Sequence, residues 1–401
     1  MISISFGVSA MAYHEDYIAR GAFSAMLRGI FLSNEAPWIL TVRSSTIDRN
    51  LRATAMLGNR MELNSESAFQ AKGLRLGQLP LVYPGINASD FGANYCLPES
   101  LNSSYVKGKV LLCTVDSTPT KIQQGRHFIT LADAHVIPAT NANYKDGLKI
   151  IAYVNSTSTP TATIVFKGTI MGDKNALTVA SFSSRGPSYV SHGILKPDII
   201  GPGVNILAAW PNSVENNANT KNNFNIISGT SVSSPHLSGV AALLKSLHPH
   251  WSPAAIKSPI MTTADTINHQ NQPIQDEKRH SADIFAMGAG HVNPTRASDP
   301  GLIYNIEPHD YIPYLCGLNY TNREVTKIFR HRVNCSAESR IPEGQLNYPS
   351  FAIGIQPSHQ RFTRTVTNVG ENNESYKVEA VPPQGFDVFV KPRMLNFSRF
   401  N

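Results

Sequence analysis

Residues 224–250 read FNIISGTSVSSPHLSGVAALLKSLHPH, and this stretch decides the fold. It opens with a short apolar run, crosses a turn of small residues, and continues with apolar residues at helical spacing. The spacing i, i+3, i+4, i+7 predicts one buried helix face. Its members are Leu237, Val240, Ala241 and Leu244, widened by Leu243 and Leu247. The sequence therefore predicts a strand-like segment, a turn and a helix.

Ser231 lies where the strand-like segment gives way to the helix. A helix N-terminus presents unpaired N–H groups and a partial positive charge. Such a position can hold the oxyanion that forms when a serine hydroxyl attacks a carbonyl group. Serine is also a common helix cap, and the residues alone favour that role. Capping and nucleophilic catalysis both stay open at this point.

The octapeptide GTSVSSPH, from Gly229 to His236, resembles the nucleophile signature of the subtilases, the subtilisin-like serine proteases. The family usually has G-T-S-M-S-C-P-H, so Val232 and Ser234 depart from it. The resemblance implies that Ser231 is the attacking serine, that the substrate is an extended peptide or protein, and that no cofactor or metal is needed. The residues expected to contact the substrate are Ser5, Phe6, Gly7, Gly229 and Thr230.

The composition bounds the class of protein. A chain of 401 residues has room for two or three domains, and 41% hydrophobic with 16% charged residues indicates a globular protein. The net charge of +7 comes from scattered Lys and Arg, which does not indicate a nucleic-acid partner. No apolar stretch approaches the roughly 20 residues of a membrane span. The N-terminal MISISFGVSA has no signal-peptide pattern.

The four cysteines form two local pairs, Cys96 with Cys113 and Cys316 with Cys335. Each pair can close a short loop, which is typical of an oxidising compartment. No C-x-x-C motif indicates zinc. Glycosylation triplets also favour a secreted glycoprotein, although a signal peptide is missing from this chain. Their asparagines are Asn87, Asn102, Asn155, Asn319, Asn334, Asn373 and Asn396.

The first segment has the order strand, helix, strand, in residues 2–7, 17–31 and 36–42. This order is typical of a parallel crossover unit. Plant subtilases have a similar segment, with the motif S-A-G-N between the helix and the second strand. The asparagine of that motif donates a hydrogen bond to the oxyanion. In this chain, residues 29–37 read GIFLSNEAP and connect the predicted helix directly to the second strand, without an S-A-G-N motif. We interpret Asn34 as part of the connecting loop and the oxyanion asparagine as deleted.

Subtilisin-type triads run Asp, then His, then Ser along the chain. The family places Asp and His in D-[ST]-G and H-G-T-H motifs, upstream of the segment with which this sequence begins. The histidines that precede Ser231 all lack an H-G-T-H setting; they are His14, His127, His135 and His192. His291 follows the serine, and we interpret it as a packed, hydrogen-bonded residue. A serine without its base is a weak nucleophile, so the chain is predicted to be inactive as written.

Residues 67–169 alternate short apolar pieces with Gly, Pro, Asn and Ser loops, which predicts a small β-rich module. Its apolar pieces include residues 79–83, 109–113 and 150–154. The segments YCLPESL and VKGKVLLC resemble the protease-associated domain that is inserted in plant subtilases. The sequence therefore predicts an insert within the catalytic unit.

Beyond the insert, the segments ASFSSRGP and LKPD again resemble plant subtilases. We interpret Arg185 as a scaffold residue, and Asp198 as the entry to a strand rather than a catalytic acid. A further helix is predicted with Ser252 as its N-cap and Pro253 in its first turn. Pro259 lies inside that helix and is expected to kink it.

Residues 343–401 contain alternating pieces, such as 362–367 and 376–381, that favour an antiparallel sandwich. They resemble the fibronectin-III-like domain that ends plant subtilases, here incomplete.

The sequence thus predicts an α/β fold, a subtilisin-like parallel sheet flanked by helices, with a protease-associated insert and a fibronectin-III-like β-sandwich. The expected parts are residues 1–66 and 170–300 (catalytic unit), 67–169 (insert), 301–342 (connection) and 343–401 (sandwich). The expected function is that of an extracellular serine endopeptidase family member. Two alternatives stay open: a non-catalytic relative that binds peptides or proteins, and a truncated gene product.

Overall fold

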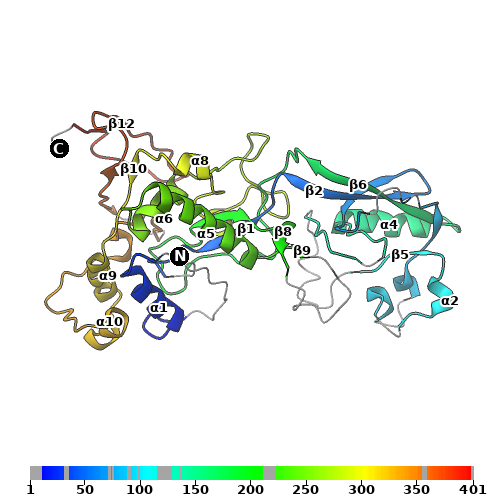
Figure 1. Ribbon diagram of the computed structural model, residues 1–401, viewed down its shortest axis with the longest axis horizontal. Coiled ribbons are helices and arrows are strands. Elements are labelled where there is room, and N and C mark those ends of the chain that lie inside the picture. Colours follow the sequence, from blue (N-terminus) through cyan, green and yellow to red (C-terminus); the bar gives the residue numbers. More distant parts are fainter. Residues whose placement is uncertain are drawn as a thin grey trace.

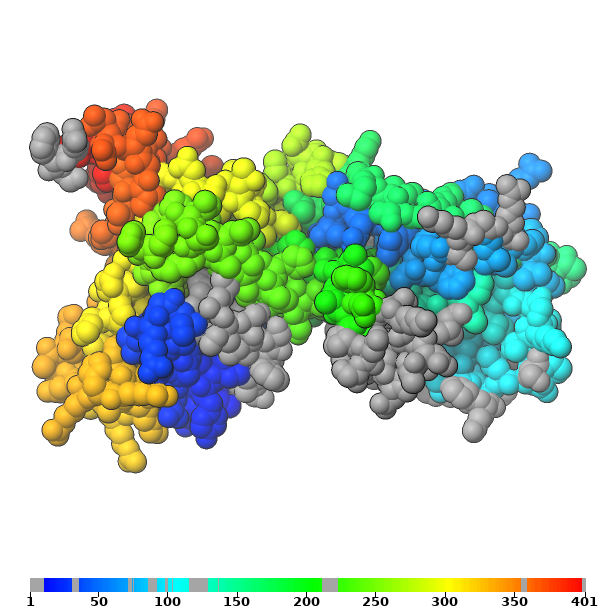
Figure 2. All heavy atoms as spheres, in the orientation of Figure 1, coloured from blue at the N-terminus to red at the C-terminus, as the bar shows by residue number. Residues whose placement is uncertain are grey.

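The computed structural model shows an elongated molecule (Figure 1). It describes residues 11–30, 36–70, 74, 76–87, 92–97, 100–114, 129–135, 137–210, 223–354 and 359–398. An α/β body surrounds helix α5 (Thr230–Leu247), and a β-rich unit extends from it to one end of the molecule. The space-filling view places the C-terminal segment at the opposite end (Figure 2).

The α/β body is built on a parallel strand pair, β1 (Val42–Ser45) and β7 (Ile199–Pro202). Helix α5 packs across both strands. The helix buries Leu237, Ala241 and Leu244 against them, because these residues recur at the spacing of one helix face. A parallel pair in the α/β body agrees with the fold class predicted from the sequence, and the predicted strand–turn–helix order at β9 and α5 is confirmed. The predicted parallel crossover of residues 2–7 with residues 36–42 stays a prediction, because residues 2–7 lie outside the described residues.

The buried face of α5 is narrower than predicted. The side chains of Leu243 and Leu247 are 63% and 62% exposed, and Val240 is only partly buried. Successive residues point 100° apart around a helix, so a single layer of strands covers only the central stripe. The prediction that Leu243 and Leu247 widen the core face was therefore wrong.

Helix α1 (Tyr17–Met26) begins where Asp16 accepts a hydrogen bond from the Ile18 amide. The predicted strand over residues 36–42 is wrong for most of its length, since strand β1 starts only at its last residue. The preceding residues form a turn that holds Trp38 against α1, where its indole N–H donates to the Ala19 carbonyl. The other predicted strand, residues 2–7, lies outside the described residues.

Helix α6 (Pro253–Thr262) starts as predicted, with the Ser252 hydroxyl accepting from the Ala255 amide. It packs beside α5. The helix continues past Pro259 to Thr262, so this proline does not end it. Pro259 is buried among its neighbours, and tertiary packing offsets the cost of the missing N–H.

The β-rich unit contains a five-stranded sheet in the order β3-β2-β6-β4-β5. Its strands are β2 (Arg49–Leu57), β3 (Glu62–Glu66), β4 (Leu79–Val82), β5 (Val110–Leu111) and β6 (Thr161–Met171). Strands β4 and β5 are parallel, and the other pairs are antiparallel. Strands β2 and β3 come from residues that the sequence analysis placed in the catalytic unit. The β-rich unit therefore begins before residue 67, where the insert was predicted to start.

The predicted strand at residues 150–154 is instead part of helix α4 (Tyr144–Ser156). Asn143 caps this helix by accepting from the Asp146 amide. The buried residues of α4 are Ile150, Tyr153 and Val154. Their spacing of i, i+3, i+4 is helical. A short apolar run such as residues 150–154 is compatible with either a strand or a buried helix, which is why the sequence analysis predicted a strand.

Several shorter elements complete the fold. They are η1 (Pro84–Asn87), η2 (Ala93–Tyr95), α2 (Ser103–Val106), β8 (Ile206–Ala209), β9 (Phe224–Ile227), α7 (Ile284–Met287), α8 (Pro294–Ala297), β10 (Leu302–Ile303), η3 (Pro308–Asp310), α9 (Tyr311–Gly317), α10 (Asn322–Phe329), η4 (Glu343–Gln345), β11 (Thr367–Asn368), β12 (Ser375–Lys377) and β13 (Met394–Asn396). Strands β8 and β9 form an antiparallel pair between α5 and the β-rich unit (Figure 1).

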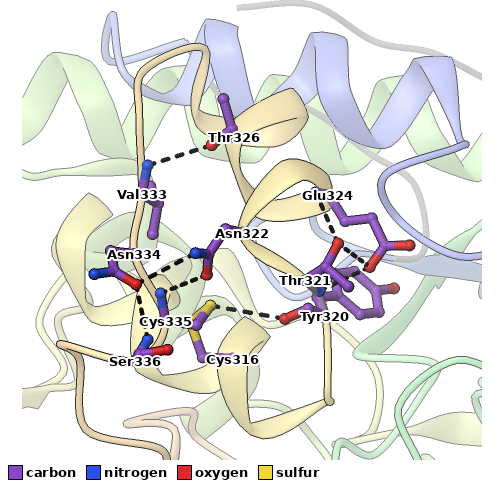
Figure 3. Close-up of a disulfide and its surroundings, with 10 residues drawn as sticks. All are labelled: Cys316, Tyr320, Thr321, Asn322, Glu324, Thr326, Val333, Asn334, Cys335 and Ser336. Atoms are coloured by element: carbon purple, nitrogen blue, oxygen red, sulfur yellow. Dashed lines mark hydrogen bonds between the residues drawn. A yellow bond between two sulfur atoms is a disulfide. The ribbon is translucent and has the colours of Figure 1, made fainter.

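Both predicted disulfides are present, Cys96–Cys113 and Cys316–Cys335. The second joins helix α9 to the loop that follows α10 (Figure 3). In this loop the Cys335 amide donates to the Asn322 side chain, and the Val333 amide donates to the Thr326 hydroxyl. The disulfide therefore closes a small, hydrogen-bonded lobe around α10.

The described part of the C-terminal segment, residues 345–354 and 359–398, takes part in two short antiparallel ladders. Strand β11 pairs with β10, and β12 pairs with β13. The predicted strand at residues 362–367 is limited to its last residue. Two packed sheets, as expected for a sandwich, are not seen in residues 345–354 and 359–398. Tyr348 of this segment is nevertheless fully buried in the core of the α/β body.

Candidate active site around Ser231

Ser231 is the second residue of α5 and is exposed. Gly229 is the N-cap, with an extended backbone, and its carbonyl accepts from the amides of Val232 (3.0 Å) and Ser233 (3.3 Å). The serine thus lies at the positive end of an 18-residue helix, on the surface. A peptide carbonyl can reach this position from solvent.

We call residues 228–231 the nucleophile turn. The Gly229 amide donates to the Gly203 carbonyl at 2.8 Å, and the Ser233 hydroxyl donates to the Arg43 carbonyl of β1 at 2.9 Å. A Cβ on Gly203 would lie 2.2 Å from the Ser44 hydroxyl oxygen and 2.9 Å from the Gly229 carbonyl oxygen. Close backbone approach at Gly203 therefore sets the position of the turn relative to β1.

The structure brings three of the predicted site residues together. Gly229 and Thr230 are partly buried beside the exposed Ser231. The predicted strand residues Ser5, Phe6 and Gly7 lie outside the described residues, as does Asn34. Their part in substrate contact stays a prediction.

Comparison of the sequence with known proteins points to one family. A profile of the subtilase family matches residues 111–290, and a profile of a fibronectin type-III domain matches residues 345–401. Subtilisin-like protease SBT1.5 of Arabidopsis thaliana is 41% identical over 452 residues, which cover 100% of this chain and 58% of that protein. The chain belongs to the subtilase family.

Other relatives of this subtilase chain give the same picture. Subtilisin-like protease SBT1.2 of Arabidopsis thaliana is 39% identical over 99% of this chain and 56% of that protein. Subtilisin-like protease SBT3 of Solanum lycopersicum is 37% identical over 100% of this chain and 57% of that protein. The chain thus spans a little over half the length of the curated relatives that it matches.

The histidines of the subtilase chain occupy different surroundings. His14 lies 3.4 Å from Glu324 of α10 and edge-on to the Tyr320 ring, so it belongs to the interface of α1 with the disulfide lobe. His291 is buried, and its Nδ1 is 3.0 Å from the Val292 carbonyl. Burial lowers its pKa to about 4. The prediction that His291 is a packed, hydrogen-bonded residue is confirmed.

Asp198 precedes strand β7, as predicted, and is fully buried. Its carboxylate accepts hydrogen bonds from the Thr41 amide (2.7 Å), the Lys196 ammonium (2.7 Å) and the Tyr348 hydroxyl (2.5 Å). A carboxylate so enclosed has no access to a substrate. Arg185 has a scaffold contact as predicted, an ion pair with Glu277 at 2.6 Å.

No group of three or more potential metal-ligating side chains occurs among the described residues. Nor is any helix of the described chain long and apolar enough to cross a membrane. A cavity of about 530 Å³ lies in the β-rich unit between β4 and the C-terminal end of α4, and its walls include no residue of the nucleophile turn.

Sequence reasoning missed the residues that hold the nucleophile turn from outside α5. Asn205 has a positive φ of 54°, and its amide donates to the Ser228 hydroxyl at 2.8 Å. The sequence offers one signal, because asparagine tolerates a left-handed backbone better than most residues. Nothing in the sequence indicates that Glu66, 139 positions earlier, is its partner.

Proposed function

We propose that Ser231 is the nucleophile of a subtilisin-type serine endopeptidase site. The observation that carries this proposal is an exposed serine in the first turn of α5, in a chain that belongs to the subtilase family. In this reaction the serine oxygen attacks a peptide carbonyl, the peptide nitrogen leaves with a proton, and water then hydrolyses the acyl-enzyme. The positive end of α5 favours the oxyanion.

The 401-residue polypeptide by itself is expected to hydrolyse peptides negligibly. It contains neither the H-G-T-H nor the S-A-G-N motif, so a base and an oxyanion donor of the family type are both missing from the given sequence. In subtilisin, losing the base alone costs on the order of 10⁶ in kcat. The alignment with SBT1.5 covers 452 residues against 401 here, which supports internal gaps in this chain.

A fluorophosphonate probe tests the proposal, with Ser231→Ala as the control. We expect slow labelling of the purified chain that is confined to Ser231, because a serine at a helix N-terminus is still the most reactive hydroxyl. Peptide mapping by mass spectrometry would locate the label. Labelling at other serines only would refute the assignment of the nucleophile. Rapid labelling at Ser231 would refute the prediction of negligible activity.

A second candidate function is peptide binding without hydrolysis. Leu207 of β8 and Phe224 of β9 are 56% and 63% exposed. The register pairs Leu207 with Ile226 and Ala209 with Phe224, so both exposed side chains lie on one face of the ladder, beside the nucleophile turn. Exposed apolar residues on a short ladder favour contact with an extended apolar peptide.

Thermal unfolding separates binding from catalysis. An extended apolar peptide at about 100 times its Kd should stabilise the chain by about 2.7 kcal/mol. The shift should persist in Ser231→Ala and be lost in Phe224→Asp. Val381→Asp is the matched control, because Val381 is also exposed but lies in the C-terminal segment. Equal losses in both aspartate variants would contradict a specific site at β8 and β9.

We infer that the five-stranded unit with α4 is the protease-associated insert, and that the protein is extracellular and glycosylated. Both disulfides fit an oxidising compartment. Asn155 and Asn319 are exposed, so their triplets can carry a glycan in the folded chain. Peptide mapping of protein secreted from a eukaryotic host would show glycan at these positions, and unmodified asparagine at both would contradict the proposal.

A further inference from the structure

Asn205 joins the nucleophile turn to the β-rich unit. It is 4% exposed and lies in the loop between β7 and β8. Its side-chain oxygen accepts from the Ala132 amide (2.8 Å) and from the Ser228 hydroxyl (3.3 Å). Its side-chain nitrogen donates to Glu66 Oε2 (3.1 Å) and to the Thr130 carbonyl (3.2 Å). One amide group therefore contacts both bodies of the molecule.

Glu66 supplies the other side of this junction. It is the last residue of β3 and is 6% exposed. Its carboxylate accepts from the Leu51 amide (3.1 Å), the Thr130 hydroxyl (2.5 Å) and the Asn205 side chain (3.1 Å). Burial raises its pKa above the ordinary value, which the hydrogen bond from Thr130 partly opposes. A buried carboxylate with three donors fixes each donor in place.

Ser228 carries this restraint into the turn. Its hydroxyl accepts from the Asn205 amide at 2.8 Å, and the next residue, Gly229, donates to the Gly203 carbonyl at 2.8 Å. The loop containing Gly203 and Asn205 therefore holds two consecutive residues of the nucleophile turn. Gly229 is the N-cap of α5, and Ser231 follows two residues later.

We propose that Asn205 and Glu66 are positioning residues for Ser231, through which the β-rich unit sets the geometry of the nucleophile turn. The inference rests on the proposed role of Ser231 as the nucleophile. Its consequence is that any displacement of β3 relative to α5 is transmitted to the turn through one hydrogen-bonded chain, Glu66 to Asn205 to Ser228.

Three variants test this chain of hydrogen bonds by exchanging donors and acceptors between positions 66 and 205. In Glu66→Gln the new amide must face either Leu51 or Asn205 with a donor, so one N–H stays unpaired. Asn205→Asp tolerates the positive φ but places two carboxylates together. The double variant restores the hydrogen bond between positions 66 and 205, since the new amide at position 66 donates to the new carboxylate at position 205 and the Thr130 hydroxyl changes from donor to acceptor. The Thr130 carbonyl still loses the donor that Asn205 supplied, so the recovery is partial. Glu62→Gln is the control on the same strand, where Glu62 is exposed and paired with Lys167.

Amide hydrogen exchange in residues 228–233 is the readout. We expect each single variant to speed exchange there about fivefold to tenfold, the value of one net hydrogen bond, with the double variant intermediate and Glu62→Gln unchanged. A general loss of stability would instead raise exchange across β2 and β6 as well. Unchanged exchange in the turn of the Glu66→Gln variant, or a double variant no better than the singles, would overturn the proposal.

Fluorophosphonate labelling of the same proteins distinguishes this inference from the proposed function. Ser231-dependent labelling together with unchanged amide exchange in residues 228–233 of the variants would refute the positioning role, while the assignment of Ser231 as the nucleophile would stand. Accelerated exchange without any labelling at Ser231 would refute the nucleophile while confirming the hydrogen-bonded chain. Slower labelling in both single variants, with partial recovery in the double variant, is the expected result.

Discussion

His291 shows how the fold opposes protonation of a single side chain. Burial lowers its pKa from 6.5 to about 4. Between these values the unfolded chain binds more protons than the folded one, so the free energy of unfolding rises with pH. Conversely, stability is lost as pH falls from about 6.5 towards about 4, by about 3 kcal/mol for a shift of this size.

Urea unfolding of His291→Gln across this pH range measures the effect. The variant should show a flatter dependence on pH than the wild type between about 4 and 6.5. Glu66 acts with the opposite sign, because its raised pKa makes stability fall as pH rises above 4.5, so the difference between variant and wild type is the quantity to compare. His280→Gln, at an exposed position, is the control. Parallel pH profiles for His291→Gln and wild type would contradict the prediction.

At the scale of elements, the approach of the loop after β7 to strand β1 and to the N-cap of α5 depends on the missing side chain of Gly203. A Cβ on Gly203 would lie 2.2 Å from the Ser44 hydroxyl and 2.9 Å from the Gly229 carbonyl, which is backbone and cannot rotate away. Gly203→Ala should therefore destabilise the protein by about 1–3 kcal/mol and displace the nucleophile turn. Urea midpoints and amide exchange in residues 228–233 check both effects.

Gly239→Ala is the matched control for that variant. Gly239 lies within α5, and nothing is within 4 Å of a Cβ built there. Alanine is the better helix former, so this change should stabilise by up to about 1 kcal/mol. Destabilisation in both variants would show that α5 tolerates no added methyl group and would remove Gly203 as a special contact.

The elements that the sequence predicted well are those with local causes. Helix α6 begins at its Ser252 cap, and α5 follows its small-residue turn, because capping and helical spacing act within a few residues. Tertiary partners decided the rest. The exposure of Leu243 depends on what covers α5, and the pairing of β2 with β6 joins residues over 100 positions apart. In the candidate site, Ser231 could be found from its motif, whereas Asn205 acquires its role only through partners distant in sequence.

At the scale of the whole molecule, a buried charged cluster joins the C-terminal segment to the α/β body. The Lys196 ammonium lies 2.7 Å from Asp198 and 3.0 Å from the Tyr348 hydroxyl. Lys257 of α6 lies 4.0 Å from the centre of the Tyr348 ring and donates to the Pro37 carbonyl. Burial lowers the pKa of Lys257, while nearby Asp198 opposes that change. The Asp198 carboxylate thus lies near two buried amines, those of Lys196 and Lys257, and Tyr348 contacts all three side chains.

Tyr348→Phe tests whether the C-terminal segment is part of the same folding unit. The Tyr348 hydroxyl donates to Asp198 at 2.5 Å, and its loss leaves a fully buried carboxylate with one donor fewer. The expected destabilisation is about 1–3 kcal/mol, and it should appear in the unfolding of α5 and α6, which contribute no atom to the lost bond. Tyr189→Phe, at an exposed tyrosine, should change stability by less than about 0.5 kcal/mol. If Tyr348→Phe accelerated exchange only in residues 345–398, the segment would be an independent appendage, and the charged cluster would not couple it to the site around Ser231.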